Sequence, residues 1–98
     1  MSKIVYKYPL HLKEEQEIIM PDGAKILHIG DQNGTVTIWA LVPVTKNPKL
    51  NKHTIYLHGT GNIADDDTMV YRDYLGSVEQ LTGFVWHLFR GKTEPYVG

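Results

Sequence analysis

Apolar and polar positions alternate over short segments of the chain, and Gly, Pro, Asn and Asp separate these segments. In residues 3–8, one face carries Ile4, Tyr6 and Tyr8, whereas two of the three residues on the other face are lysines. A period of two is typical of a half-buried strand. Similar runs predict further strands over residues 16–20, 24–29, 35–42, 54–58, 71–78 and 83–90. These runs favour an all-β fold.

Two turns are predicted from their residues. Asn33-Gly34 between two apolar runs is a strong signal for a β-hairpin. Pro21-Asp22-Gly23 suits successive positions of a tight turn. The run 43–52, with its prolines, asparagines and lysines, reads as a solvated connection, and residues 77–82 leave room for a single helical turn.

The run 35–42 is apolar on one face, and it carries Trp39 and Leu41 on the other. Both faces of this strand are therefore expected to be covered, which predicts a central strand. Six to seven strands over 98 residues can enclose one core. We predict a single domain over residues 1–98, a small antiparallel sandwich or partly open barrel with at most a minor helix.

Charge and composition narrow the functional classes. The chain has ten Lys and Arg residues and eleven Asp and Glu residues, so its formal net charge is -1 and it has no excess of cations for binding duplex nucleic acid. The absence of cysteine excludes disulfides and thiolate metal sites and fits a reducing compartment. No apolar run reaches the length of a membrane span or signal peptide, so we expect a cytoplasmic protein without membrane contact.

The segment 54–62 carries the strongest candidate for a binding site, because Gly59 and Gly61 stand one residue apart after a strand-like run. Both glycines can adopt φ > 0, and the N–H groups of such a turn can converge on an anion. Thr60 and Asn62 would add side-chain donors. The spacing matches neither the Walker loop nor the dinucleotide-binding motif. The alternative is a hairpin loop that needs glycine for its backbone angles.

Aromatic and cationic residues complete the predicted site. Tyr56 or Trp86 would stack on a base, with core packing as the alternative for the tryptophan, and Arg72 or Arg90 would offset phosphate charge. The predicted ligand-binding residues are Tyr56, His58, Gly59, Thr60, Gly61, Asn62, Arg72, Trp86 and Arg90. No cofactor and no resident metal is expected.

Two other chemistries stay open. A zinc site would need three or four ligands from His53, His58 and the acidic run Asp65 to Asp67, for which simple exposure to solvent is the alternative. A hydrolase could use His58, Asp65 and Thr60, although no Gly-x-Ser-x-Gly elbow or other fixed catalytic signature occurs.

Several phrases together carry a resemblance to a known family. They are Ile4-Val5-Tyr6-Lys7-Tyr8-Pro9-Leu10, Met20-Pro21-Asp22-Gly23-Ala24-Lys25-Ile26-Leu27, Gln32-Asn33-Gly34 with Ile38-Trp39-Ala40-Leu41-Val42, Ile55-Tyr56 with Gly59-Thr60-Gly61, and Tyr74-Leu75-Gly76 with Phe84-Val85-Trp86-His87-Leu88-Phe89. The chain resembles a family of small proteins of tailed bacteriophages and prophages. Members often carry Gly-Thr-Gly-His followed by proline, whereas Asn62 and Ile63 stand here, which weakens a catalytic or metal-binding role for the loop.

The resemblance implies a phage protein that acts in the cytoplasm of an infected bacterium, and it implies no mechanism. By analogy with other small phage proteins, we expect a non-enzymatic accessory protein that sequesters a small phosphorylated, nucleotide-derived ligand such as a host immune signal. We expect a homo-oligomer, because 98 residues enclose little pocket volume. The alternatives are a protein-interaction module that inhibits a host protein or belongs to the virion, and a small hydrolase.

Overall fold

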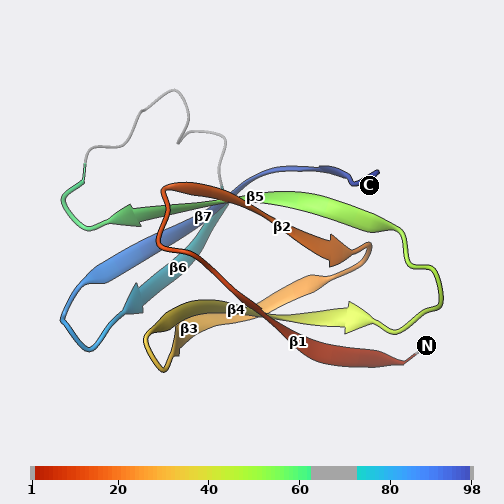
Figure 1. Ribbon diagram of the computed structural model, residues 1–98, viewed down its shortest axis with the longest axis horizontal. Coiled ribbons are helices and arrows are strands. Elements are labelled where there is room, and N and C mark those ends of the chain that lie inside the picture. Colours follow the sequence, from red (N-terminus) through yellow and green to blue (C-terminus); the bar gives the residue numbers. More distant parts are fainter. Residues whose placement is uncertain (1, 63–72, 98) are drawn as a thin grey trace.

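The computed structural model describes residues 2–62 and 73–97. Its strands are β1 (Lys3–Pro9), β2 (Glu15–Pro21), β3 (Lys25–Gln32), β4 (Thr35–Pro43), β5 (Leu50–Gly59), β6 (Asp73–Glu79) and β7 (Val85–Pro95). They form two layers (Figure 1): a three-stranded sheet in the order β1-β4-β3 and a four-stranded sheet in the order β2-β5-β7-β6. All pairings are antiparallel. The sheets do not close into a barrel, so the prediction of an all-β sandwich is confirmed.

The core lies between the two sheets. In β4, residues Val36, Ile38 and Ala40 have no exposed surface, and β4 is the central strand of its sheet, as predicted. The buried apolar residues are Leu10, Ile18, Met20, Val36, Ile38, Ala40, Val42, Ile55, Leu57, Val78 and Leu88. Apart from Leu10, which follows β1, they come from strands of both sheets at alternate positions, which is the period of two that the sequence shows.

The two predicted turns form. Asn33 and Gly34 have φ angles of 51° and 89° and connect β3 to β4 as a hairpin. The Ala24 N–H donates to the Pro21 carbonyl at 3.1 Å, and Gly23 has a φ angle of 86°. This second turn carries the chain from the four-stranded to the three-stranded sheet, so β2 and β3 are neighbours in sequence without pairing.

Three sequence expectations need correction. β5 begins at Leu50, so the connection before it is shorter than residues 43–52, and β7 continues to Pro95. No helical turn forms at residues 77–82, because β6 continues to Glu79 and a hairpin turn follows in which the Gly83 N–H donates to the Gln80 carbonyl at 2.8 Å. Part of the predicted strand 71–78 lies outside the described residues. Within the described residues, no helix could span a membrane.

The edges of the two sheets meet along β3 and β6, which contact each other across the sandwich. The side chain of Gln80 connects the sheets at one end of this contact. Its amide nitrogen donates to the Gly34 carbonyl at 3.1 Å and its amide oxygen accepts from the Trp86 indole at 3.0 Å. One glutamine therefore ties the β3–β4 turn to the β6–β7 hairpin.

Candidate functional site

The glycine segment folds as a tight turn at the end of β5. The Asn62 N–H donates to the Gly59 carbonyl at 3.0 Å, which closes a four-residue β-turn. Gly61, at the third position, has a φ angle of 87°, a value that favours glycine. Gly59 does not adopt φ > 0; a Cβ there would lie 2.7 Å from the Phe84 ring and 2.9 Å from Nδ2 of Asn62. Gly59 therefore permits close packing.

The amides of this turn differ from the predicted anion cradle. The Thr60 N–H donates to the Val85 carbonyl at 3.1 Å, and the Asn62 N–H closes the turn. These two groups already have partners within the fold and do not converge on open space. The Thr60 and Asn62 amides therefore stabilise a structural turn, and the prediction that these two N–H groups converge on an anion is wrong.

The Thr60 side chain of the turn contacts His87, which lies on the outer face of the four-stranded sheet. Oγ1 of Thr60 is 2.8 Å from Nε2 of His87, and the Tyr74 hydroxyl is 3.0 Å from Nδ1 of the same ring. His58 is the cross-strand partner of His87, and its ring meets Phe89 edge-on with centroids 5.9 Å apart. An imidazole between two hydroxyl groups can pass a proton between them. Thr60 therefore has His87, not His58, as its imidazole partner.

The two predicted stacking aromatics occupy different environments. Tyr56 packs against the backbone of Gly91, where a Cβ would lie 2.6 Å from the tyrosine ring. Trp86 packs on the core, is bound to Gln80, and lies 4.7 Å from the Phe84 ring between centroids. Trp86 therefore packs against the core, which was the alternative to stacking on a base.

Arg90 lies away from the glycine turn. Gly59 pairs with Trp86 on β7, and Arg90 is four residues farther along that strand, a separation of about 13 Å at ~3.3 Å per residue. The predicted residues Arg72 and Asp65 to Asp67 lie outside the described residues. Within residues 2–62 and 73–97, no group of three or more His, Asp or Glu side chains is arranged to hold a metal ion.

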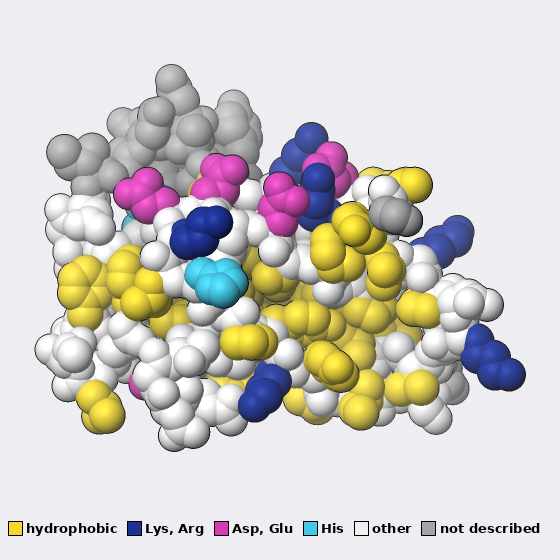
Figure 2. All heavy atoms as spheres, viewed as in Figure 1, with side chains coloured by type: hydrophobic (Ala, Val, Ile, Leu, Met, Phe, Trp, Pro, Cys, Tyr) yellow, Lys and Arg dark blue, Asp and Glu magenta, His cyan; other side chains and the backbone are white. Residues whose placement is uncertain are grey.

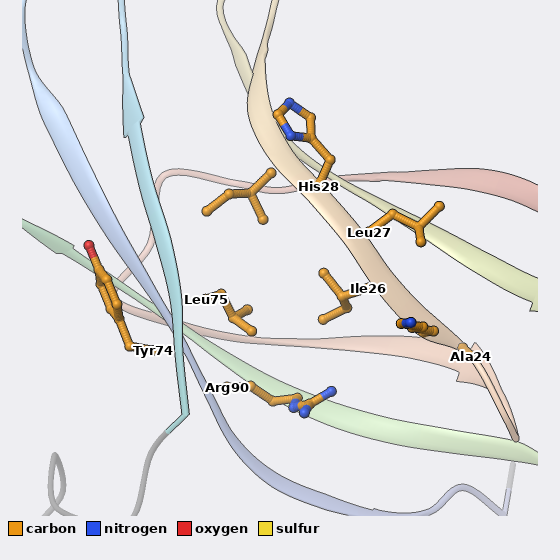
Figure 3. A pocket seen from close by; sticks show the side chains of 9 residues that line it. Ala24, Ile26, Leu27, His28, Tyr74, Leu75 and Arg90 are labelled. Atoms are coloured by element: carbon orange, nitrogen blue, oxygen red, sulfur yellow. The ribbon is translucent and has the colours of Figure 1, made fainter.

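Arg90 instead lines a pocket of about 420 Å³ between β3 and β6, which we call the β3–β6 opening. Its lining residues are Ala24, Lys25, Ile26, Leu27, His28, Ile29, Tyr74, Leu75 and Arg90. In Figure 3, the side chains of Ile26 and Leu75 point toward each other from the two sheets, and Arg90 extends from β7 beneath them. The opening therefore combines an apolar wall from each sheet with one guanidinium group.

Two β-bulges shape this opening. Ile26 and His28 pair with consecutive residues of β4, so Leu27 is an extra residue in β3. Tyr74 and Gly76 likewise pair with consecutive residues of β7, which makes Leu75 the extra residue of β6. A bulge bends its strand and redirects side chains. Both strands are irregular where they face each other.

Two cationic side chains, Arg90 and Lys25, line the opening. The Arg90 side chain is 32% exposed and forms an ion pair of 3.3 Å with Asp73, whose side chain is 70% exposed. Lys25 and His28 are exposed on β3, and the His28 ring packs near Trp39 with centroids 5.5 Å apart. A guanidinium group that keeps further N–H donors, with a lysine nearby, can bind a phosphate or carboxylate.

Sequence reasoning missed most residues of the β3–β6 opening. Lys25, Ile26 and Leu75 belong to no binding or catalytic motif, and the approach of two edge strands brings them together. His28 is exposed on β3 beside Ile29, which packs against the core. The Gly76 interruption of the predicted strand 71–78 was the one local signal, since glycine within a strand often marks a bulge.

His53 is a buried imidazole on β5, on the core side of the four-stranded sheet. It is 6% exposed, and Nδ1 lies 3.1 Å from Oγ1 of Thr93. Among the described residues, Nε2 has no hydrogen-bond partner. Burial, and secondarily the positive charge of Arg90, lowers the pKa of His53 below its ordinary value of 6.5.

This pKa shift predicts a loss of stability in acid. Below about pH 6.5 the unfolded chain binds a proton at His53 before the folded chain does, so stability should fall as the pH drops toward the folded pKa, by at most about 1.4 kcal/mol per pH unit. An NMR titration of the assigned His53 ring, together with urea unfolding between pH 7 and pH 5, measures both effects. His53→Leu should flatten the pH dependence. A folded-state midpoint at or above 6.5 would contradict the prediction.

Comparison with known proteins gives one result. A family model described as a domain of unknown function matches residues 1–97, nearly the whole chain. No curated protein and no solved structure matches the chain.

Proposed function

We propose a function for this chain, which belongs to the family DUF7352, from the geometry of the β3–β6 opening. The protein binds and sequesters a small phosphorylated, nucleotide-derived ligand there, without converting it. The observation that carries the proposal is the position of Arg90, whose side chain lies in a pocket walled by apolar residues of two different sheets.

The chemistry of the walls suits a ligand with one anionic and one flat apolar part. Arg90 supplies a fork of N–H donors, and within residues 2–62 and 73–97 its one ion-pair partner is Asp73 at 3.3 Å. Ile26 and Leu75 are apolar surfaces on which a base can lie. Lys25 stands at the rim as a second, exposed cation. In this arrangement the phosphate of the ligand contacts Arg90 and Lys25, and its base lies between Ile26 and Leu75.

The size of the opening agrees with this ligand class. Small-molecule sites in proteins commonly have volumes of about 300–1,000 Å³, and the opening has about 420 Å³. A mononucleotide or one half of a cyclic dinucleotide is of this size class. The glycine turn is not part of this site, because it lies beside the start of β7, whereas Arg90 is four residues beyond Trp86, in the middle of that strand.

The biological setting comes from the resemblance to small phage proteins. In that setting, a host immune signal is the nucleotide-derived molecule whose capture serves the phage, so the proposed role is counter-defence in the host cytoplasm. Sequestration requires tight binding and slow release, which a rigid β-sandwich with a preformed site supports.

Binding of a defined nucleotide panel tests the proposal. Thermal shift and calorimetry with AMP, ATP, cyclic AMP and cyclic dinucleotides should identify at least one that stabilises the protein. Arg90→Met should weaken its binding by about 10- to 100-fold, the cost of losing a hydrogen bond to a charged group. Mass spectrometry of the nucleotide released by denaturation should show it unaltered.

Lys92→Met is the matched control. Lys92 is a cation on the same strand, its side chain is 72% exposed, and it pairs with Glu94 outside the β3–β6 opening. Its removal should leave nucleotide binding unchanged. If no member of the panel binds, or if Arg90→Met and Lys92→Met behave alike, the proposed site is wrong; a chemically altered nucleotide would instead favour the hydrolase.

A further inference from the structure

β1 is an edge strand with a regular set of outward-facing backbone groups. Among the described strands it pairs with β4 only. The Val44 N–H donates to the Ser2 carbonyl at 2.9 Å, and the Leu10 N–H donates to the Val36 carbonyl at 2.8 Å. Hydrogen-bonded pairs alternate in an antiparallel ladder, so every even-numbered residue between these ends faces β4. The odd-numbered residues Lys3, Val5 and Lys7 therefore direct both backbone groups away from the sheet.

Three consecutive apolar side chains are exposed along this edge, between Lys3 and Lys7. Ile4, Val5 and Tyr6 are 49%, 52% and 56% exposed. Figure 2 shows hydrophobic side chains gathered on the face where, in Figure 1, β1 and β2 border the space between the sheets. An exposed apolar edge strand is a template for pairing with another strand. The ammonium group of Lys7, which could block such pairing, is held by Gln32 at 3.0 Å.

β2, the edge strand of the other sheet that pairs with β5, exposes less apolar surface. In β2 the Leu57 N–H donates to the Glu14 carbonyl and the Asp22 N–H donates to the Lys49 carbonyl, so the backbone groups of the odd-numbered residues face outward. Both edges carry charged residues at such positions, Lys3 and Lys7 on β1 and Glu15 and Glu17 on β2. Only β1 of these two strands exposes three consecutive large apolar side chains, because Ile18 and Met20 of β2 are buried. Strand addition is therefore favoured at β1.

We propose that β1 pairs antiparallel with β1 of a second copy of this chain, about a twofold axis at Tyr6. The two three-stranded sheets then become one six-stranded sheet in the order β3-β4-β1-β1-β4-β3. An antiparallel strand pair about a twofold axis is an isologous interface, which the same surface of both copies forms.

The register follows from the backbone and from charge. If the twofold axis passes through a residue position, odd-numbered residues pair with odd-numbered residues, so outward-facing backbone groups meet each other. An axis between two residues would pair odd-numbered with even-numbered residues. An axis at Val5 would place Lys3 opposite Lys7, and an axis at Lys7 would place two copies of Lys7 opposite each other, which like-charge repulsion disfavours. An axis at Tyr6, the midpoint of Lys3–Pro9, pairs the whole strand and places Val5 opposite Lys7.

The side chains on the core face of β1 complement themselves in this register. Tyr6 lies opposite Tyr6 of the second copy, and Ile4 lies opposite Tyr8 of the second copy. The Tyr6 and Tyr8 rings share this face, with centroids 5.6 Å apart. Aromatic pairs and pairs of an aromatic with a β-branched residue are favourable cross-strand neighbours, and these positions are the closer, non-hydrogen-bonded ones. Dimerisation therefore covers Ile4 and Tyr6.

Oligomeric state is the first test. In sedimentation or light scattering, the purified protein should have twice its chain mass of 11.2 kDa. Val5→Pro removes an outward N–H without touching the β4 ladder and should raise the dimer dissociation constant about tenfold or more. Ile19→Pro makes the same change at the outward-facing edge of β2 and should leave the dimer intact. A wild-type monomer at about 0.1 mM overturns the proposal, as does equal dimerisation of the two variants.

Single-cysteine variants test the register, because the chain has no cysteine. Tyr6→Cys places two thiols at the axis, where opposing Cα atoms lie about 4.5 Å apart, and should oxidise to a covalent dimer. Val5→Cys places them on a diagonal of about 7–8 Å and should cross-link poorly. Both positions are about half exposed, so folding is little affected. Cross-linking of Val5→Cys in preference to Tyr6→Cys would overturn the Tyr6-centred pairing.

Discussion

Leu88→Ala is expected to lower the free energy of unfolding by about 2–5 kcal/mol. Leu88 has no exposed surface and lies on β7 between its partners Leu57 on β5 and Gly76 on β6. Strands on both sides hold the backbone in place, so the cavity can collapse only partly. Small domains have a total stability of about 5–15 kcal/mol. Urea unfolding at one fixed protein concentration measures the loss and keeps any effect of self-association constant.

Leu81→Ala is the matched control, because it deletes the same atoms from a side chain that is 101% exposed in the β6–β7 turn. Surface changes of this kind usually alter stability by no more than about 0.5 kcal/mol. A similar loss in the two variants would mean that the inner face of β7 is not the centre of the core.

Gly76→Ala is expected to cost about 1–3 kcal/mol in backbone strain, with a further cost from crowding. Gly76 has a φ angle of 133°, and a Cβ there would lie 3.1 Å from Cδ1 of Ile29. Gly76 follows the bulge residue Leu75, so the strain falls on the wall of the β3–β6 opening. Urea unfolding should show the loss, and any nucleotide found to bind the wild type should bind this variant more weakly.

Gly34→Ala separates the two contributions. Gly34 also has positive φ, at 89°, but no atom of the described residues outside its immediate neighbours lies within 4 Å of a Cβ placed there. It should therefore lose less stability than Gly76→Ala and leave nucleotide binding unchanged. Equal effects of the two variants on stability and binding would contradict a special role for the Gly76 position.

Local patterns predicted most strands and both turns, because period-two burial and the Asn33-Gly34 signal act over a few residues. The assignment of strands to sheets could not be predicted in the same way. The turn at Pro21-Asp22-Gly23 looks like a hairpin turn in sequence, yet it connects different sheets. Which strand β2 pairs with depends on the fit of whole faces, and no short motif encodes that choice.

The residues of the candidate site were harder to predict from local patterns than the strands were. The sequence predicts Arg90 as an anion contact, and Arg90 does line a pocket. Gly59 and Gly61 lie outside this pocket, since Gly59 permits close packing against Phe84 and Gly61 adopts the positive φ angle of the turn. The partners of Arg90 in the opening come from bulges at Leu27 and Leu75. An extra residue in a ladder is visible only once the register of both strands is known.

The Gln80 bridge closes one end of the seam between the two sheets. Its amide group joins Gly34 to Trp86 where β3 and β6 finish, whereas Arg90, Ala24 and Leu75 lie where these strands begin. At that second end the chain itself crosses from one sheet to the other through the turn that precedes Ala24. The seam is therefore anchored at both ends, by a hydrogen-bonded side chain at one and by covalent backbone at the other, so an amide-free side chain at position 80 would release the first anchor while the crossing turn still holds the end beside Arg90.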